Sequence, residues 1–283
     1  MIRKAVIPIA GYGTRMLPAT ISIPKTMLTV VNKPVIEYII DEIIKAGITE
    51  ILLITNLGSS IIENHFARSF ELENFLKEND DLATLSKIKN RYKNINIYVK
   101  KASSNTSLAE SVYDAKGFVN GEPFLLVLGD EIFDTSISCS DLLIKKYNEL
   151  KAPIIAVKRV DKDKIKNYGI IEGREYKDNL IIIDKMLEKP KKEETSSDLA
   201  IIGRYILNAS IFDEIELLNE LNFTKAIHNL KELKFAIAID NERYDCGSKL
   251  GLVKANIALA LKDKEISEEL KKYLKDITKR MEE

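Results

Sequence analysis

The chain has 283 residues, 45% of them hydrophobic, which is enough for one large α/β core or a core with an appendage. Its 43 basic residues balance 43 acidic ones, and a net charge of zero argues against nucleic acid or an acidic membrane as the main partner. No apolar run approaches the ~20 residues that span a bilayer. The two distant cysteines form no CxxC pair, and no signal peptide precedes the first strand, so we expect a cytoplasmic protein with reduced thiols.

The first element is an apolar run over residues 5–9, which predicts a buried strand. It leads into the turn Ala10-Gly11-Tyr12-Gly13-Thr14-Arg15, whose glycines allow backbone N–H groups to approach an anion closely. Arg15 places a positive charge beside this turn, and Lys25 adds a second ten residues later. A glycine turn with two cations is typical of a polyphosphate cradle, although the Gly-x-Gly pair alone is weakly specific.

The next segments complete a strand–helix–strand unit. Residues 34–46 carry isoleucines at helical spacing and are followed by Gly47, and residues 50–55 form a second apolar run. This order predicts a parallel sheet with a right-handed crossover and a ligand site beyond the carboxyl ends of its strands. An oxidoreductase is disfavoured, because Met16 replaces the third glycine of a dinucleotide motif and Thr55 ends the second strand without an acidic residue.

Residues 59–93 predict a charged helical excursion that could shape a site rim or an oligomer contact, with His65 as a structural residue. A strand at 95–99 follows, and Ser107 is suited to cap the next helix. Residues 125–128 form a further buried strand, so that Asp130 projects at its carboxyl end toward the crevice of the glycine turn. From this segment alone, an Asx turn or a helix cap explains Asp130 equally well.

The second half predicts strands at 152–160, 199–205 and 235–239, and helices at 209–218 and 223–230. Asp245 then precedes Cys246, which we interpret as a packing residue because no histidine is placed to activate it. The tail, 263–283, has an amphipathic helical pattern whose apolar stripe must cover either its own domain or another subunit.

Five ordered phrases between residue 4 and about residue 260 resemble the sugar-1-phosphate nucleotidylyltransferases, most closely the bacterial-type UTP–glucose-1-phosphate uridylyltransferases. They are GYGTRMLPAT with IPK, FLLVLGDEIFD, EKP, LAIIGRY and DCGSKLG. The resemblance implies an α/β fold: a Rossmann-like, mostly parallel mixed sheet flanked by helices, glycosyltransferase-A-like, with a helical C-terminal extension. We expect a nucleotidyltransferase domain at 1–262 and the extension at 263–283.

The implied reaction is Mg²⁺-dependent, in-line transfer of the uridylyl group from UTP to glucose 1-phosphate, with UDP-glucose and pyrophosphate as products. The partners are a nucleoside triphosphate and a sugar 1-phosphate, and the family often forms homodimers or homotetramers. Three cations are implied as catalytic: Arg15, Lys25 and Lys189. Matching the family's motifs gives nucleotide-binding residues (Ala10, Gly11, Gly13, Thr14, Arg15, Lys25, Ser107, Leu108, Asp130), sugar-phosphate-binding residues (Gly169, Glu188, Lys189) and metal ligands (Asp130, Asp245).

Two segments depart from the family pattern. The loop at 100–111, which reads the base in the family, lacks the usual Gln and first Gly and keeps only Leu108-Ala109. Residues 219–226 differ from the usual DEIQLTDA phrase. Two alternatives therefore stay open: transfer from dTTP or to another sugar 1-phosphate, and a degenerate paralogue that binds a nucleotide-sugar without turnover.

Overall fold

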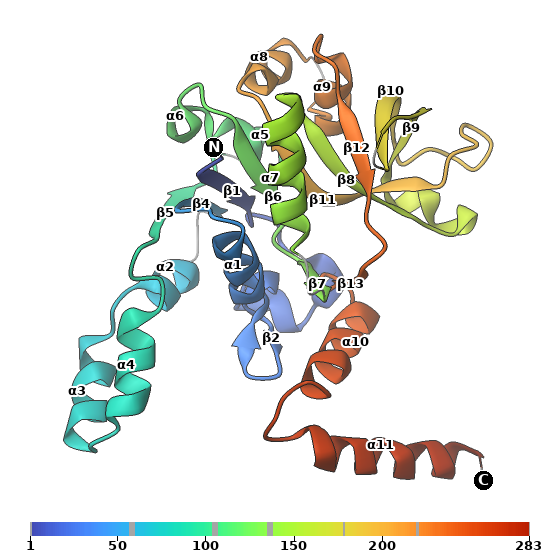
Figure 1. The fold of residues 1–283 in the computed structure, drawn as a ribbon. Helices are drawn as coiled ribbons and strands as arrows, with labels where there is room; N and C mark the ends of the chain where they lie inside the picture. The colour runs from blue at the N-terminus through green and yellow to red at the C-terminus, as the bar shows by residue number, and fades with distance from the viewer. Residues whose placement is uncertain are drawn as a thin grey trace. The chain divides into compact units, whose positions relative to one another are not determined.

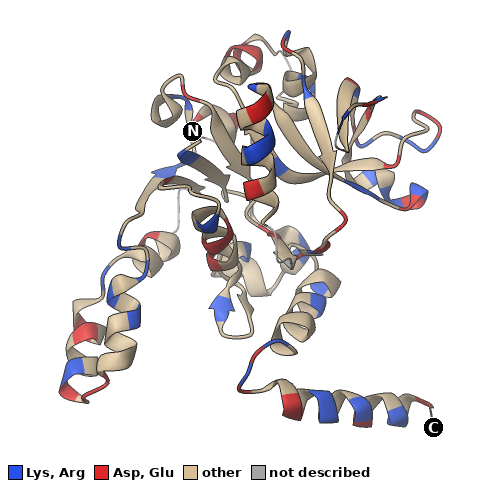
Figure 2. Ribbon diagram, in the orientation of Figure 1, with Lys and Arg blue, Asp and Glu red and all other residues tan. Residues whose placement is uncertain are grey.

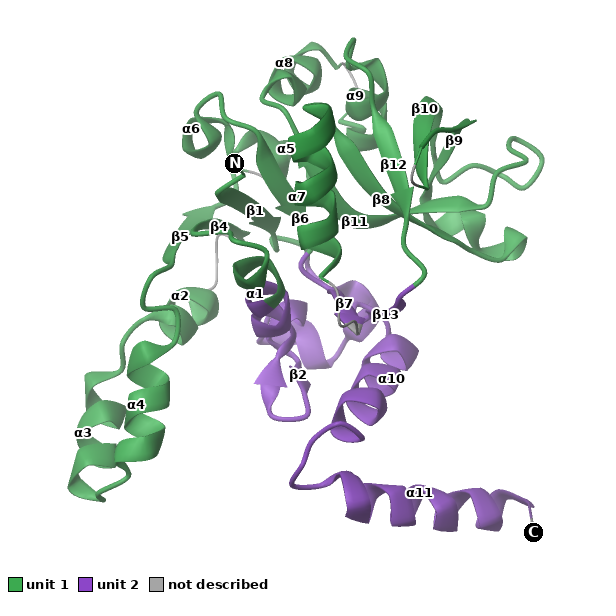
Figure 3. Ribbon diagram, in the orientation of Figure 1, with its two compact units in different colours: residues 1–11, 42–128, 137–240 green, residues 12–41, 129–136, 241–283 purple. Residues whose placement is uncertain are grey.

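The computed structural model describes residues 2–56, 60–103, 107–134, 138–177, 179–218 and 221–282. The chain divides into two compact units, each built from separate stretches of sequence (Figure 3). Unit 1 comprises residues 1–11, 42–128 and 137–240, and unit 2 comprises residues 12–41, 129–136 and 241–283. In the described part of the chain, no helix combines the length and apolarity needed to cross a bilayer.

Unit 1 is built on a mixed sheet that has nine strands in the described residues (Figure 1). Their order is β5-β4-β1-β6-β11-β8-β12-β10-β9. Strands β5, β4, β1 and β6 run parallel to one another, β8 pairs in parallel with β12, and the other neighbours are antiparallel. The strands span Lys4–Pro8 (β1), Glu50–Thr55 (β4), Asn96–Lys101 (β5), Phe124–Val127 (β6), Ile154–Arg159 (β8), Gly169–Glu175 (β9), Leu180–Glu188 (β10), Leu199–Leu207 (β11) and Phe235–Ala238 (β12).

The expected α/β fold with a mixed sheet is confirmed, and its parallel block contains the N-terminal strand. β1 lies inside that block and is covered on both faces, since Ala5, Val6 and Ile7 are fully buried. A strand in this position needs a continuous apolar run, which is what the sequence has there. In register, Val6 lies between Leu52 of β4 and Leu126 of β6. The chain therefore leaves β1 for the glycine turn at the carboxyl end of a parallel strand, as the sequence predicted.

Helices cover both faces of this sheet. One set of alternating strand residues, including Val6 and Phe124, packs with α5 (Leu108–Tyr113), α8 (Ser210–Leu217) and α9 (Phe223–Asn229) in a single apolar core. The helix α7 (Cys139–Leu150) instead contacts β8 and β11. Two further helices are α1 (Val35–Lys45), which is followed by Gly47 with φ +92° and belongs to unit 1 only from residue 42 on, and the short α6 (Lys116–Val119).

The predicted helical excursion between β4 and β5 is confirmed as three helices. They are α2 (Ile61–Phe66), α3 (Phe70–Glu78) and α4 (Leu82–Asn90), and α3 packs against α4 as a helical hairpin (Figure 1). Ser69 Oγ accepts a hydrogen bond from Leu72 N, and Asp81 Oδ1 accepts one from Thr84 N, so both helices of the hairpin begin at a side-chain cap.

Unit 2 contains two small antiparallel ribbons, β2 (Thr29–Val30) with β3 (Lys33–Pro34), and β7 (Glu131–Asp134) with β13 (Glu242–Asp245). Three 3₁₀ turns, at Thr14–Met16, Ala19–Ile21 and Lys25–Met27, follow the glycine turn. The helices α10 (Lys249–Ala260) and α11 (Ser267–Glu282) end the chain. Figure 2 shows the charged faces of α11, which buries none of its described residues.

Candidate functional site

In unit 2, the β7–β13 ribbon brings two aspartates together from positions 115 residues apart in sequence. Glu131 pairs with Asp245 in register, and Cys246 N donates a hydrogen bond to Asp130 O at 2.8 Å. Asp130 therefore lies immediately before one strand of the ribbon, and Asp245 is the last residue of the other. The sequence predicted both carboxylates as metal ligands, but the ribbon that joins them was not anticipated.

Two cations from the N-terminal segment bind these carboxylates. Arg15 Nη1 lies 3.3 Å from Asp245 Oδ2, and Arg15 Nη2 lies 4.0 Å from Asp130 Oδ2. Lys25 Nζ makes a short ion pair with Asp130 Oδ2. All four charged residues of the predicted triphosphate and metal site thus form one cluster in unit 2.

The backbone around Gly13 holds the two cations in place. Gly13 has φ +64°, a conformation that strains residues with a Cβ, and a Cβ there would lie 3.1 Å from Lys25 Cβ. Thr20 Oγ1 donates a hydrogen bond to Gly13 O at 2.9 Å, which closes the turn. Thr14 then begins the 3₁₀ turn that carries Arg15, whose side chain is 62% exposed and accessible to a ligand.

Gly247 lies at the centre of this cluster, although the sequence did not predict it as a site residue. A Cβ at this position would lie 2.5 Å from Asp130 Oδ2, 2.8 Å from Arg15 Nη2 and 3.0 Å from Asp245 Oδ1. Gly247 N also donates a hydrogen bond to Asp245 Oδ1 at 3.0 Å. The phrase Asp-Cys-Gly held the signal, because a glycine two residues after a carboxylate allows the backbone to approach it.

The donor set of this cluster fits a hard divalent cation. Asp130 and Asp245 offer carboxylate oxygens, and both already lie within ion-pair reach of one guanidinium. Mg²⁺ binds one or two carboxylates and completes its shell with water and substrate phosphate oxygens. Within the described ranges, no three His, Cys, Asp or Glu side chains are grouped to hold a metal by themselves. A metal here would therefore need oxygens from a bound substrate.

Cys246 is not equipped to act as a nucleophile. Its side chain is 1% exposed, and burial together with the charges of Asp130, Asp245 and Glu131 raises the pKa of its thiol to about 12. The thiolate is the reactive form of cysteine, so this thiol is inert near neutral pH. The predicted packing role agrees with this environment.

A second group of predicted residues lies in unit 1, where β10 ends beside the start of β9. Glu188 pairs in register with Gly169, and Lys189 Nζ lies 3.1 Å from Glu188 Oε1. Lys189 N donates a hydrogen bond to Tyr168 O at 3.0 Å, and this fixes the chain as it leaves β10. The three predicted sugar-phosphate residues are thus neighbours.

Thr224 belongs to the same group and was missed by sequence reasoning. Its Oγ1 donates a hydrogen bond to Glu188 Oε2 at 2.6 Å, and it would lie 3.3 Å from a Cβ at Gly169. The sequence did carry a signal for this residue, because Thr224 keeps the threonine of the usual DEIQLTDA phrase while most of its neighbours in 219–226 differ. Residues 219 and 220 of that phrase lie outside the described residues.

The remaining predicted nucleotide residues lie in two turns. Ala10 is buried after β1, whereas a Cβ at Gly11 would meet no atom within 4 Å. Ser107 caps α5 as predicted, since its Oγ accepts a hydrogen bond from Glu110 N at 3.1 Å, and Leu108 is the first residue of that helix. Residues 104–106 of the expected base-reading loop lie outside the described residues.

Comparisons with known proteins show the family to which the chain belongs. The sequence profile of the Nucleotidyl transferase family matches residues 4–261. UTP–glucose-1-phosphate uridylyltransferase 2 of Staphylococcus saprophyticus is 37% identical, with 98% of each chain covered. UTP–glucose-1-phosphate uridylyltransferase of Streptococcus pyogenes is 40% identical over 99% of this chain and 96% of the relative.

Solved structures give the same result. UDP-glucose pyrophosphorylase from Acinetobacter baumannii superimposes with a TM-score of 0.92 and 33% identity, covering 98% of this chain and all of the other. A UTP-bound UGPase from the same organism gives a TM-score of 0.91, also at 33% identity, with 97% and 99% of the two chains covered.

Proposed function

Since the chain belongs to the nucleotidyl transferase family, we propose that it transfers the uridylyl group of UTP to glucose 1-phosphate, giving UDP-glucose and pyrophosphate. The observation that carries this proposal is the unit 2 cluster, in which Arg15 and Lys25 lie on the carboxylates of Asp130 and Asp245. Such a cluster offers both signs of charge to a metal–triphosphate complex.

In this proposal the triphosphate binds through the glycine turn and the two cations. Backbone groups of Ala10, Gly11, Gly13 and Thr14 approach the phosphates, and Gly11 leaves space because, among the described residues beyond its chain neighbours, no atom lies within 4 Å of where its Cβ would be. Arg15 and Lys25 neutralise the β- and γ-phosphates and then the departing pyrophosphate. Ser107 and Leu108, at the start of α5, hydrogen-bond the pyrimidine edge through their backbone.

The sugar 1-phosphate binds through the unit 1 group. Lys189 Nζ pairs with the sugar phosphate, and Glu188 accepts hydrogen bonds from sugar hydroxyls beside Gly169. Thr224 orients the Glu188 carboxylate through its 2.6 Å hydrogen bond. Glu188 Oε1, which lies 3.1 Å from Lys189 Nζ, can then accept a hydrogen bond either from Lys189 or from a sugar hydroxyl.

Asp130 and Asp245 would hold Mg²⁺, whose charge, when it is bound, lowers the repulsion between the two anionic substrates. A phosphate oxygen of glucose 1-phosphate attacks the α-phosphorus of UTP in line. The bond between the α-phosphorus and the α,β-bridging oxygen breaks, and pyrophosphate leaves with the electron pair. The attacking phosphate is already ionised near neutral pH, so no general base is required. Arg15, Lys25 and Lys189 therefore act by positioning and by charge neutralisation.

A substrate panel tests this function. Purified protein with Mg²⁺ is offered UTP, dTTP, ATP, CTP or GTP with glucose 1-phosphate or galactose 1-phosphate, and pyrophosphate release is followed. We expect UTP with glucose 1-phosphate to give the highest kcat/KM, about tenfold or more above dTTP. A preference for dTTP would favour the thymidylyltransferase alternative. Saturable nucleotide-sugar binding without pyrophosphate release from any pair would instead favour the degenerate paralogue.

A further inference from the structure

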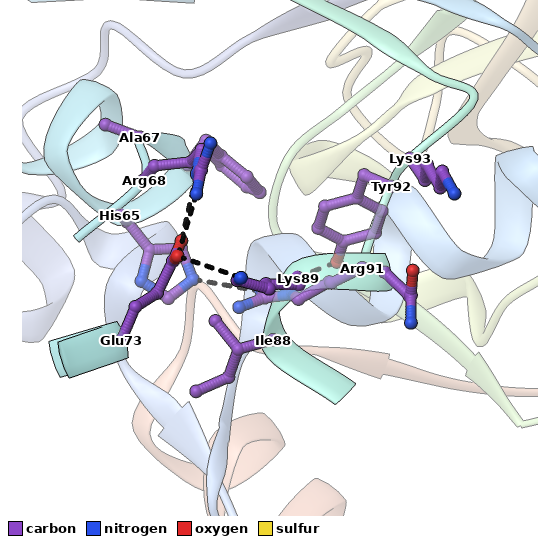
Figure 4. A pocket seen from close by; sticks show the side chains of 11 residues that line it. His65, Ala67, Arg68, Glu73, Ile88, Lys89, Arg91, Tyr92 and Lys93 are labelled. Carbon is purple, nitrogen blue, oxygen red and sulfur yellow. Dashed lines mark hydrogen bonds and ion pairs between the residues drawn. The ribbon is translucent and has the colours of Figure 1, made fainter. Parts of the chain in front are cut away.

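A cavity of about 420 Å³ lies within the helical excursion of unit 1 (Figure 4). It is lined by residues 65–68, at the end of α2 and just after it, by Glu73 of α3, and by residues 88–93, at the end of α4 and just after it. This volume lies in the range of ligand pockets, roughly 300–1,000 Å³. No residue of either proposed substrate group lines it.

The walls of this cavity carry a surplus of positive charge in a chain whose net charge is zero. Four lining residues are cationic (Arg68, Lys89, Arg91, Lys93), and Glu73 is the only carboxylate among the eleven lining residues. Arg68 holds the Glu73 carboxylate with two hydrogen bonds, of 2.9 and 2.8 Å, and Lys89 Nζ lies 3.6 Å from it (Figure 4). One acidic charge is thus shared by two cations, and the pocket keeps a formal surplus of three positive charges.

Aromatic rings form a second feature of the cavity. The rings of Phe66 and Tyr92 have centroids 5.9 Å apart, and the Arg91 guanidinium lies 4.9 Å from the Tyr92 centroid. Arg91 Nη2 also donates to His65 Nε2 at 3.2 Å, which fixes the guanidinium beside the rings (Figure 4). A planar ring can stack against aromatic and guanidinium faces, while cations bind a phosphate.

We propose that this cavity binds a small phosphorylated molecule with a planar ring, of the nucleoside monophosphate class. Its phosphate lies against Arg91 and Lys93, and its ring lies against Phe66 and Tyr92. The site shares no residue with the proposed nucleotide and sugar-phosphate groups, and the inference does not depend on the proposed uridylyl transfer. It gives the helical excursion a binding role that its charged sequence left open.

The chain contains no tryptophan, so a single introduced tryptophan reports on this cavity alone. Phe66→Trp places the reporter in the cavity wall, and Tyr273→Trp, on exposed α11, serves as the matched reporter outside it. Full-length protein is titrated with AMP, with UMP and with inorganic phosphate. We expect AMP and UMP to change the Phe66→Trp emission saturably, with Kd below about 1 mM, and inorganic phosphate to bind at least about tenfold more weakly.

Charge variants in the Phe66→Trp background locate the binding. Arg91→Gln combined with Lys93→Gln should raise the Kd for AMP at least about tenfold, whereas Lys87→Gln, on α4 outside the cavity, should change it less than about twofold. If the double variant does not fold, Lys93→Gln alone, at an exposed side chain, should still raise Kd about threefold. The proposal is overturned if AMP does not saturate the reporter by about 10 mM, if phosphate alone binds as tightly as AMP, or if Lys87→Gln weakens binding as much as the cavity variants.

Discussion

Two glycines of the proposed nucleotide site differ in what a methyl group would meet. At Gly11 a Cβ would meet no atom of the described residues within 4 Å, apart from its chain neighbours, so we expect any effect of a side chain there to arise from the bound ligand. At Gly247 a Cβ would lie 2.5 Å from Asp130 Oδ2 and 2.8 Å from Arg15 Nη2, so it would displace the charged groups themselves. A substitution at Gly11 therefore tests how closely a ligand approaches the backbone, whereas one at Gly247 tests the arrangement of the charged cluster.

Gly11→Ala should raise the KM for UTP about tenfold while the Tm stays unchanged, because the methyl group blocks only the approach of a phosphate. Gly247→Ala should lower kcat instead, by about tenfold or more, because it moves Asp130 and Arg15. Gly117→Ala is the matched control, since a Cβ there also meets no atom within 4 Å and Gly117 lies in α6. Steady-state kinetics with thermal melts measure all three. An unchanged KM in Gly11→Ala would remove the glycine turn from the site.

The thiol of Cys246 gives a second prediction at this scale. Its pKa is raised from 9.0 to about 12, first by burial and then by Asp130 and Asp245. At pH 8 the thiolate fraction is then far smaller than in the unfolded chain, so alkylation by iodoacetamide should be slower by at least about a hundredfold. Mass spectrometry of tryptic peptides follows the modification in native and in denatured protein. Comparable rates in the two states would contradict the buried, anion-flanked environment.

At the scale of the element, a buried ion pair ties α1 to α7 and β11. Arg204 Nη2 lies 2.7 Å from Glu42 Oε2, and Ser140 N and Oγ donate to Glu42 Oε1 at 3.0 and 2.7 Å. The Arg204 side chain is fully buried. Burial raises the pKa of Glu42, but the charge and hydrogen bonds of Arg204 and Ser140 outweigh it, and the net pKa lies below its ordinary 4.5.

Because the pKa of Glu42 is lower in the folded chain than in the unfolded chain, its contribution to stability is present above pH 4.5 and is lost as the pH falls through the folded value. Glu42→Gln should therefore destabilise the protein at pH 7, by about 3–5 kcal/mol, since it removes the carboxylate that pairs with the buried Arg204 side chain. The loss should shrink as the pH falls below 4.5. Urea unfolding across this pH range measures it, and a loss independent of pH would contradict the pairing.

Elements that follow local patterns could be predicted from the sequence. The apolar run at Glu50–Thr55 and the caps at Ser107 and Gly47 are set by neighbouring residues, so the predicted and observed elements agree closely. The ribbon of β7 with β13 could not be predicted, because its four-residue strands carry charges and pair across more than a hundred residues.

The same distinction applies to the candidate site. Motif resemblance predicted Asp130, Asp245, Arg15 and Lys25 as site residues, and the structure places their charged groups in one cluster. It did not identify Gly247 or Thr224, whose roles depend on which carboxylate the folded chain brings beside them. The cavity between α2 and α4 was also missed, since its residues share no sequence spacing that points to a ligand.

At the scale of the whole molecule, α11 is a long helix that buries none of its described residues. None of its described residues is buried, yet Leu270, Leu274 and Ile277 form one apolar stripe with Tyr273 and Met281 exposed beside it. We propose that residues 263–283 are an extension of a domain at 1–262, and that this stripe supports a homodimer or homotetramer.

Deletion of residues 263–283 should change the Tm of the remaining chain by less than about 2 °C, because the helix buries no side chain of its own. It should also reduce the mass of the particle in solution to that of a monomer. Light scattering and thermal melts of the full and shortened chains measure both effects. A full-length chain that is monomeric, together with a large fall in Tm on deletion, would contradict the proposed extension.

The most direct test of the proposed reaction is the pyrophosphate-release rate of Asp130→Asn and Asp245→Asn with UTP, glucose 1-phosphate and Mg²⁺. Asp184→Asn, at an exposed aspartate that pairs with Arg174, is the matched control. The account predicts that each site variant keeps its fold by circular dichroism and loses kcat by about a hundredfold or more, while the control keeps the parent rate. Turnover in both site variants at the rate of Asp184→Asn would contradict it.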